Sequence, residues 1–153
     1  MAYQKLQVER ALAVIASDTI NIPNVAGAST SGTTDGTVAN KLVDSTAAFT
    51  SNLLNYIVYN TTDSTVATVT AVDDANTLTL SADIMATGEA YTIYSDANTG
   101  CVLYSGSGGD VKVLTAGNDE VTFTGVAAGA FIPVQVKRVF ATPTPPTGIV
   151  ALW

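Results

Sequence analysis

The fold is decided by residues 101–153, which read CVLYSGSGGDVKVLTAGNDEVTFTGVAAGAFIPVQVKRVFATPTPPTGIVALW. Apolar and polar residues alternate in this stretch, the pattern of strands with one buried face. Gly-rich and Asn-Asp turns separate the alternating runs, because Gly tolerates positive φ and Asn and Asp bond their own backbone. The pattern predicts an antiparallel β-meander with strands at residues 101–104, 110–115, 120–124 and 131–140.

The longest predicted strand, residues 131–140, carries two irregularities. Alternate apolar side chains share one face as far as Val136, whereas Val139 is out of phase by one residue. This change of phase predicts a β-bulge near residues 137–138 or the end of pairing there. Pro133 has no amide hydrogen to give to a ladder, which predicts a sheet edge at that point.

The chain ends in residues 149–153, IVALW, which are all apolar. Burying a Leu or Val side chain stabilises a protein by roughly 1.5–3 kcal/mol, so exposing this segment is unfavourable. Two interpretations remain open. The segment is the last strand of its own subunit's sheet, or it docks on a neighbouring subunit.

Residues 33–95 differ from the rest of the chain and indicate a separate module. Strands and turns recur there at a spacing of roughly 8–12 residues, which is typical of a small barrel or sandwich. Residues 26–37 contain only small residues and Asp and predict a linker, and residues 45–52 predict a helical turn capped by Ser45. The module carries seven acidic residues against one lysine, a net charge of −6, and the rest of the chain carries −1.

We therefore predict an all-β protein of two parts. Residues 1–31 plus 96–153 form a discontinuous attachment and assembly domain, an antiparallel β-sandwich or meander built from both chain ends. Residues 33–95 form an inserted acidic module resembling a small β-barrel. Insertions of this kind enter at exposed loop tips.

Composition limits the classes of function. Charged residues make up 12% of the 153 residues, about half the usual share, which favours a protein that hides surface in an assembly. The net charge of −7 argues against a nucleic-acid partner, since no basic stripe can displace counterions from phosphates. No apolar run approaches the roughly 18–20 residues that cross a bilayer, so no membrane partner is expected. The apolar residues 11–16 are too few for a signal peptide and predict a first strand, with a helix over residues 4–16 as the alternative.

The sequence offers little catalytic chemistry. It has no histidine, which excludes Ser-His-Asp, Cys-His and histidine–metal sites, and we predict neither enzyme activity nor a cofactor. The single cysteine, Cys101, is expected to be a small buried apolar group.

Other polar motifs have structural explanations. The adjacent carboxylates Asp73 and Asp74 fall in a predicted hairpin turn. Together with Asp63 and Asp83 they could supply oxygen ligands to a calcium ion, but no loop of the chain has the ligand spacing of an EF-hand. Residues 106–109, GSGG, predict a hairpin rather than a phosphate loop. Residues 60–62 form a glycosylation sequon, which matters only in a eukaryotic secretory setting. Core packing is favoured over a sugar-stacking platform for four tyrosines, Tyr56, Tyr59, Tyr91 and Tyr94.

Six segments near the two chain ends form a recognisable set: MAYQKL, SDTINIP, GCVLY, GGDVKV, FIPVQVKRV and IVALW, at residues 1–6, 17–23, 100–104, 108–113, 131–139 and 149–153. Together they resemble a family of small virion structural proteins. These proteins occur in tailed phages and in gene-transfer-agent particles, and some are described as spike base proteins. The six segments are strand and turn patterns and include no catalytic motif. Residues 33–94 are extra relative to the short members of the family.

The resemblance implies a non-enzymatic protein on the particle exterior. We expect a capsid decoration (cement) protein that binds the outside of the head and stabilises it. Its expected partners are its own copies, as a trimer, and the major capsid protein or another virion protein. The alternative is a spike or fibre base or host-adhesion protein whose inserted module binds a cell-surface glycan. The expected assembly interface comprises Phe131, Val134, Val136, Val139, Phe140, Ile149, Val150, Leu152 and Trp153.

Overall fold

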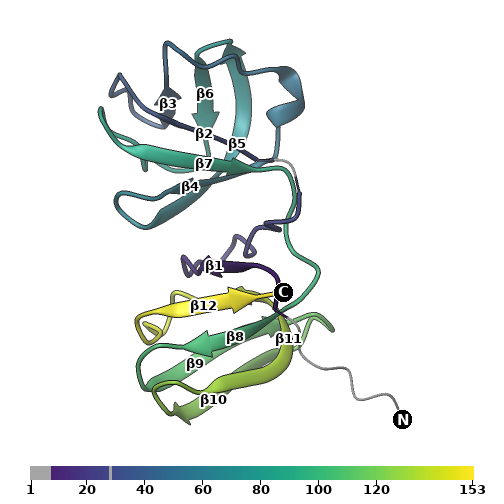
Figure 1. Cartoon of the computed structure of the whole chain (residues 1–153). Coiled ribbons are helices and arrows are strands. Elements are labelled where there is room, and N and C mark those ends of the chain that lie inside the picture. The colour runs from purple at the N-terminus through teal and green to yellow at the C-terminus, as the bar shows by residue number, and fades with distance from the viewer. Residues whose placement is uncertain (1–7, 28) are drawn as a thin grey trace. The chain divides into compact units, whose positions relative to one another are not determined.

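A computed structural model describes residues 8–27 and 29–153 of the chain (Figure 1). These residues form strands β1 to β12 and one 3-10 turn, η1, with no α-helix among them. The predicted all-β fold class is confirmed. All pairs of neighbouring strands in the two sheets are antiparallel.

The chain divides into two compact units. Unit 1 comprises residues 1–26 and 98–153, and unit 2 comprises residues 27–97. The prediction assigned residues as far as 31 to the discontinuous domain and took residues 26–37 for a linker. That linker contains strand β2 (Ser29–Thr33), which pairs along its whole length with β7 (Ala90–Tyr94) of unit 2. Its Ser, Thr and Gly residues give no apolar alternation, and the strand was therefore missed.

Unit 1 is one six-stranded sheet in the order β1-β12-β8-β11-β9-β10. Strands β9 and β10 alternate apolar and polar residues, whereas β1, β8 and β12 are apolar nearly throughout. The six strands are β1 (Ala11–Ala13), β8 (Cys101–Ser105), β9 (Gly109–Thr115), β10 (Glu120–Val126), β11 (Phe131–Val139) and β12 (Ile149–Leu152).

The two chain ends meet in this sheet. Strand β12 lies between β1 and β8, with Leu152 opposite Ala11 on one side and Val102 on the other. The Trp153 amide donates to the carbonyl of Arg10 at 3.0 Å. The last segment is thus a strand of its own subunit's sheet, the first of the two interpretations, and the predicted first strand exists. Residues 1–6 of the resemblance and residues 4–7 of the alternative helix lie outside the described residues.

Strand β11 shows both of the predicted irregularities. Its register against β9 shifts between Val136 and Arg138, which confirms the bulge. Although β11 as a whole lies between β8 and β9, β9 pairs with it only from Val136 onward, so the predicted sheet edge at Pro133 is confirmed. Proline is tolerated there because Pro133 falls in a second irregularity, between Ile132 and Val136, before pairing with β9 begins.

The core of unit 1 lies on one face of the sheet, which we call the inner face. Cys101 is 1% exposed, and its thiol donates to the Val136 carbonyl at 3.2 Å, so the prediction of a buried apolar role is confirmed. Asn98 ties the N-terminal segment to the sheet by donating from its side chain to the carbonyls of Ile22 and Lys137. The buried cluster comprises Ile22, Cys101, Leu103, Val111, Val113, Ile132, Val136, Val139, Ile149 and Ala151.

Unit 2 is a second six-stranded sheet, in the order β2-β7-β4-β5-β6-β3. It curls because β5 (Thr65–Asp74) pairs with β4 through residues 65–68 and with β6 through residues 69–74. A bridge between Gly36 and Val43 brings the chain after β2 against β3, so the curled sheet resembles the predicted small barrel. Its other strands are β3 (Lys41–Val43), β4 (Ile57–Asn60) and β6 (Thr77–Leu80).

The interior of unit 2 is filled by eleven buried side chains from its strands and from residues 49–53 and 85. The predicted helical turn at residues 45–52 is shorter and later than expected, since η1 spans Ser51–Leu53. Ser45 does not cap it and instead donates its backbone amide to Asp35 at 3.0 Å. The buried cluster comprises Leu42, Phe49, Leu53, Val58, Ala67, Val69, Leu78, Leu80, Met85, Tyr91 and Ile93.

Candidate functional site: an apolar outer sheet face

The sheet of unit 1 is apolar on the side that points away from its core as well. Residues opposite each other in an antiparallel pair share a face. Phe131 lies opposite Tyr104, and Tyr104 lies opposite Val150, whereas their neighbours Ile132 and Leu103 belong to the core. We call this set the outer apolar face, and it comprises Ala11, Ala13, Val102, Tyr104, Phe131, Val150 and Leu152.

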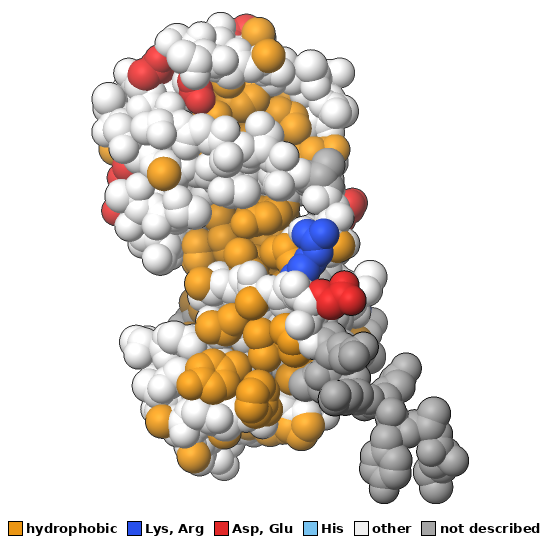
Figure 2. Space-filling view, in the orientation of Figure 1, with side chains coloured by type: hydrophobic (Ala, Val, Ile, Leu, Met, Phe, Trp, Pro, Cys, Tyr) orange, Lys and Arg blue, Asp and Glu red, His pale blue; other side chains and the backbone are white. Residues whose placement is uncertain are grey.

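Phe131 is the most exposed large hydrophobic side chain on this face. It is 56% exposed, and its ring packs edge-to-face against Tyr104 with centroids 5.6 Å apart. An edge-to-face aromatic pair is worth about 0.5–1.5 kcal/mol beyond its buried area, so the two rings hold each other in place. Figure 2 shows hydrophobic side chains gathered over the sheet of unit 1.

The outer apolar face contains no charged residue, whereas the other half of the same side of the sheet is charged. On β9 and β10, Lys112 forms an ion pair with Glu120 at 2.9 Å. Lys112 also lies over the ring of Phe140, 4.3 Å from its centroid, with Arg138 at 5.7 Å. Arg138 is further held by Asn21, through a bond of 2.9 Å from its Nε. The sheet therefore places its charges away from the outer apolar face.

The nine predicted interface residues do not form one surface, because neighbouring residues of a strand point to opposite faces. Phe131, Val150 and Leu152 lie on the outer apolar face. Phe140 is buried beneath Lys112 and Arg138. The others belong to the core or pack against it: Val134, Val136, Val139, Ile149 and Trp153.

Sequence reasoning missed four residues of the outer apolar face: Ala11, Ala13, Val102 and Tyr104. A signal for two of them existed. Residues 101–104 are a continuous apolar run, and continuous runs indicate strands with apolar residues on both faces. The two alanines could be found only through the pairing of β1 with β12, which joins segments at opposite ends of the sequence.

The carboxylates considered for calcium are not brought together. Asp73 pairs with Lys41 at 2.7 Å, Asp83 accepts the Asn40 amide at 2.8 Å, and Asp74 accepts the Asn76 amide at 2.7 Å. Among the described residues, no group of three or more possible metal ligands occurs. These side chains fix turns of unit 2 and offer no shared cation site.

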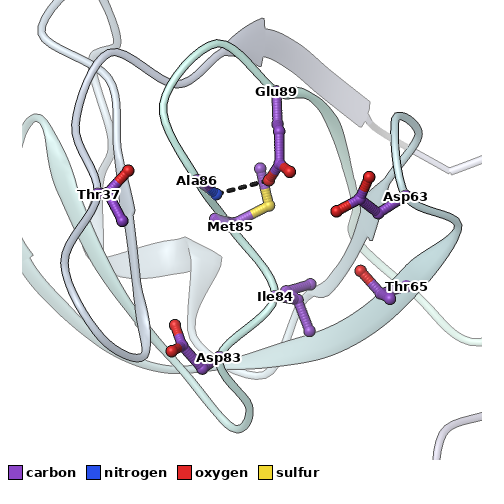
Figure 3. Close-up of a pocket in the computed structure, with 8 residues that line it drawn as sticks. All are labelled: Thr37, Asp63, Thr65, Asp83, Ile84, Met85, Ala86 and Glu89. Atoms are coloured by element: carbon purple, nitrogen blue, oxygen red, sulfur yellow. Dashed lines mark hydrogen bonds between the residues drawn. The ribbon is translucent and has the colours of Figure 1, made fainter.

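A shallow pocket of about 310 Å³ in unit 2 is lined by three carboxylates, Asp63, Asp83 and Glu89, of which Asp63 and Glu89 interact with each other (Figure 3). The Ala86 amide donates to Glu89 at 2.5 Å, and this bond holds the pKa of Glu89 below its ordinary value. Hydrogen bonding to Glu89 and its negative charge raise the pKa of Asp63. Asn60 also donates to Glu89, at 2.9 Å. Glu89 therefore anchors the loop before β7, which is a structural role.

Two further motifs are occupied by structural contacts. Asn60 of the sequon is fully buried, and its side-chain nitrogen donates to Glu89 and to the Ile84 carbonyl, so it cannot carry a glycan in the folded unit. The tyrosines do not form a sugar platform, since Tyr59 and Tyr91 are 2% and 3% exposed. The prediction of core packing is confirmed for these two.

No protein-family model, curated protein or solved structure matches this chain. The resemblance to virion structural proteins stays a prediction. No helix among residues 8–27 and 29–153 is long and apolar enough to cross a membrane. The outer apolar face is the feature of unit 1 that best supports a function.

Proposed function

We propose that the chain is a non-enzymatic structural component of a phage particle that attaches through the outer apolar face of unit 1. The observation that carries the proposal is the uncharged apolar side of a sheet whose other side already holds a full core. Antiparallel sheets commonly place polar residues on the side away from their core. Apolar residues there, with Phe131 exposed on an outermost strand of the set, are typical of an interaction surface.

The energy available from this face suits repeated attachment of many copies. Burying the exposed part of Phe131, 56% of the side chain, contributes about 1–2 kcal/mol, and the partly exposed Tyr104, Val150 and Leu152 contribute smaller amounts. A single contact of this size is modest after the cost of association. Copies that also contact one another gain from effective concentration, as decoration of a shell requires. Bound copies stabilise the shell because they bind the closed shell, and opening the shell would disrupt their binding sites.

The charges of the chain support a division of roles between the units. By sequence, residues 27–97 carry eight acidic residues and one lysine, a net charge of −7, whereas the remaining residues carry five of each sign. Neutral unit 1 can approach its own copies and a capsid protein without repulsion. Acidic unit 2 suits a solvent-facing position on the particle exterior and helps to keep the free protein soluble.

The proposal is tested by replacing Phe131 with Asp and measuring the mass of the full chain by light scattering. Wild-type chain is expected as an oligomer, and Phe131→Asp as a monomer, because the carboxylate would lose its hydration in the interface. Val121→Asp is the matched control, since Val121 is 38% exposed but lies opposite Val113, on the core side of the sheet. A monomeric wild type, or equal losses from both variants, would contradict attachment through this face.

The alternative function is a spike or fibre base or host-adhesion protein, in which unit 2 binds a glycan. It requires a sugar site in unit 2. An NMR titration of the full chain with maltohexaose tests this alternative, which predicts shifts of unit 2 amides.

A further inference from the structure

Each of the two sheets has two edge strands, and three of these four edges carry devices that discourage further pairing. Natural edges are blunted by short length, charge, proline or bulges. Strand β1 is three residues long and follows Arg10, β3 is three residues long and begins at Lys41, and β10 begins at Glu120 and contains a register shift with Gly125 at φ +62°. These strands are poor templates for a further strand.

The fourth edge, β2, lacks these devices. It is five residues long, reads Ser-Thr-Ser-Gly-Thr, contains no charge or proline, and pairs with β7 without a register shift. Its regular pairing leaves the second edge of the strand straight. This edge is therefore a suitable template for an added strand.

The direction of the backbone groups of β2 follows from its neighbour β7. Ala90 accepts from the Thr61 amide at 2.9 Å and donates to Thr62 at 3.0 Å, so both of its backbone groups point toward β4. Alternation then turns the groups of Tyr91 toward β2, where they meet Gly32. The amide and carbonyl groups of Ser31 and Thr33 consequently point to the outer side, and no hydrogen bond joins them to any described residue.

The chain itself uses this outer side at one point and then leaves it. Two residues beyond Thr33, the Asp35 amide donates to the Val43 carbonyl of β3 at 3.0 Å. After Val43 the chain turns away at Asp44, whose carboxylate accepts the Thr46 amide at 2.9 Å. If β3 continued beyond Val43, it would lie beside Ser31 and Thr33. Because the chain turns away, this position next to β2 is left open.

The open position is lined as a groove. A pocket of about 350 Å³ lies between residues 30–32 of β2 and residues 46–53, and a smaller one of about 130 Å³ continues it along Ser29 and Thr30. Thr30 lies opposite buried Ile93 but is itself exposed, so the wall of the curled sheet is open here. Side chains of an added strand would reach Leu53, Tyr56 and Ile93.

One end of the groove is closed by a buried polar pair. The Tyr91 hydroxyl donates to Asp44 at 2.7 Å, and a Cβ added to Gly32 would lie 2.5 Å from an oxygen of each residue. Asp44 is 2% exposed and is also bonded to Thr46, so its carboxylate is engaged within the unit. The groups offered to a partner are therefore the backbone groups of β2.

From these observations we propose that the groove along β2 binds an extended basic polypeptide segment as an added strand. Amide and carbonyl groups at two-residue spacing match an extended peptide, which offers complementary groups at the same spacing. The charge of unit 2 selects a basic partner, since its one lysine, Lys41, is paired with Asp73. The inference stands on unit 2 alone and does not depend on the proposed function of unit 1.

The test is an NMR titration of the full chain with an acetylated peptide of alternating Thr and Val flanked by Lys. Shifts of the Ser31 and Thr33 amides are expected. Two further peptides are N-methylated, one at each of the two sets of alternate residues. One of them should no longer shift these amides and the other should still shift them, because only one edge of the peptide faces β2. Flanking Glu instead of Lys should weaken binding at least tenfold at low salt.

Variants of the protein supply the matching control. Ser31→Pro removes the outward amide hydrogen and should abolish peptide binding, whereas Ser31→Ala keeps it and should bind as wild type. The proposal would be overturned by no shift at the β2 amides, by equal effects of N-methylation on both edges, by equal binding of acidic and basic peptides, or by shifts with maltohexaose in place of the peptide. Shifts that grow with protein concentration alone would assign the groove to a second copy and would also overturn it.

Discussion

Tyr91→Phe is expected to destabilise unit 2 and to leave unit 1 unchanged. The Tyr91 hydroxyl is the donor to Oδ2 of Asp44, at 2.7 Å, and both residues are buried. Burial and the neighbouring Asp44 raise the pKa of Tyr91 well above its ordinary value, so the hydroxyl keeps its proton and remains a donor. Removing a hydrogen bond to a charged group costs about 1.5–3 kcal/mol, because the buried Oδ2 of the carboxylate then lacks this partner, while Oδ1 keeps its bonds from Thr46.

The two units can be observed separately in one urea titration. The single tryptophan, Trp153, belongs to unit 1, so its fluorescence reports that unit, and far-UV circular dichroism reports both. With a denaturant slope of about 1 kcal/mol per molar urea for a unit of this size, the variant should shift the unit 2 transition by about 2 M. The fluorescence midpoint should stay in place. Ile132→Ala, in the unit 1 core, is the matched control and should shift the fluorescence midpoint instead.

The pH dependence gives a second measure of the same bond. Although burial opposes ionisation of Asp44, hydrogen bonds from Thr46 and Tyr91 lower its pKa below the model-peptide value of 3.8. A lowered folded-state pKa stabilises unit 2 above pH 3.8, and this contribution is lost as pH falls through the folded value. Tyr91→Phe should reduce that acid-dependent loss. An unchanged urea midpoint together with an unchanged acid profile would refute the reasoning.

Two further outcomes are expected in unit 1. Burial raises the pKa of the Cys101 thiol to about 12, so a thiol-specific reagent at about pH 8 should not react with the native chain and should react once urea unfolds it; rapid native labelling would contradict the burial. The Thr142 hydroxyl and amide bond to Asp18 and lower its pKa, so part of the stability of unit 1 should be lost as pH falls below about 4. Asp18→Asn should flatten that part of the fluorescence-detected acid profile, and an identical profile would refute the role of Asp18.

The sequence was informative where side chains determine local geometry. The phase change at Val139 predicted the bulge of β11, and the Asn-Asp turn before β10 contains Asn118 at φ +70°, a conformation that asparagine tolerates. Strand β2 was missed because Ser, Thr and Gly do not distinguish a strand from a linker. Pro133 correctly predicted an edge at its own position, but the pairing of the rest of β11 with β9 on that side could not be predicted from the sequence.

Only part of the candidate site could be predicted from the sequence, because the site depends on the pairing of segments that are distant in the chain. Phe131, Val150 and Leu152 could be named from the sequence, but the face on which each lies depends on register against β8 and β1. A shift of one residue would exchange the two faces. Nothing in a single sequence fixes the pairing of strands that lie more than a hundred residues apart, such as β1 and β12.

The points at which the chain leaves and re-enters unit 1 have a consequence for how such proteins diversify. In unit 2, Ser29 and Tyr94 are paired neighbours, so both ends of the insertion lie side by side. In unit 1, the Asn98 amide donates to the Ile22 carbonyl at 2.9 Å, so the two flanking ends also lie side by side. Because the two ends are adjacent in both units, we expect that recombination can replace, enlarge or remove unit 2 without changing the strand pairings of the unit 1 sheet.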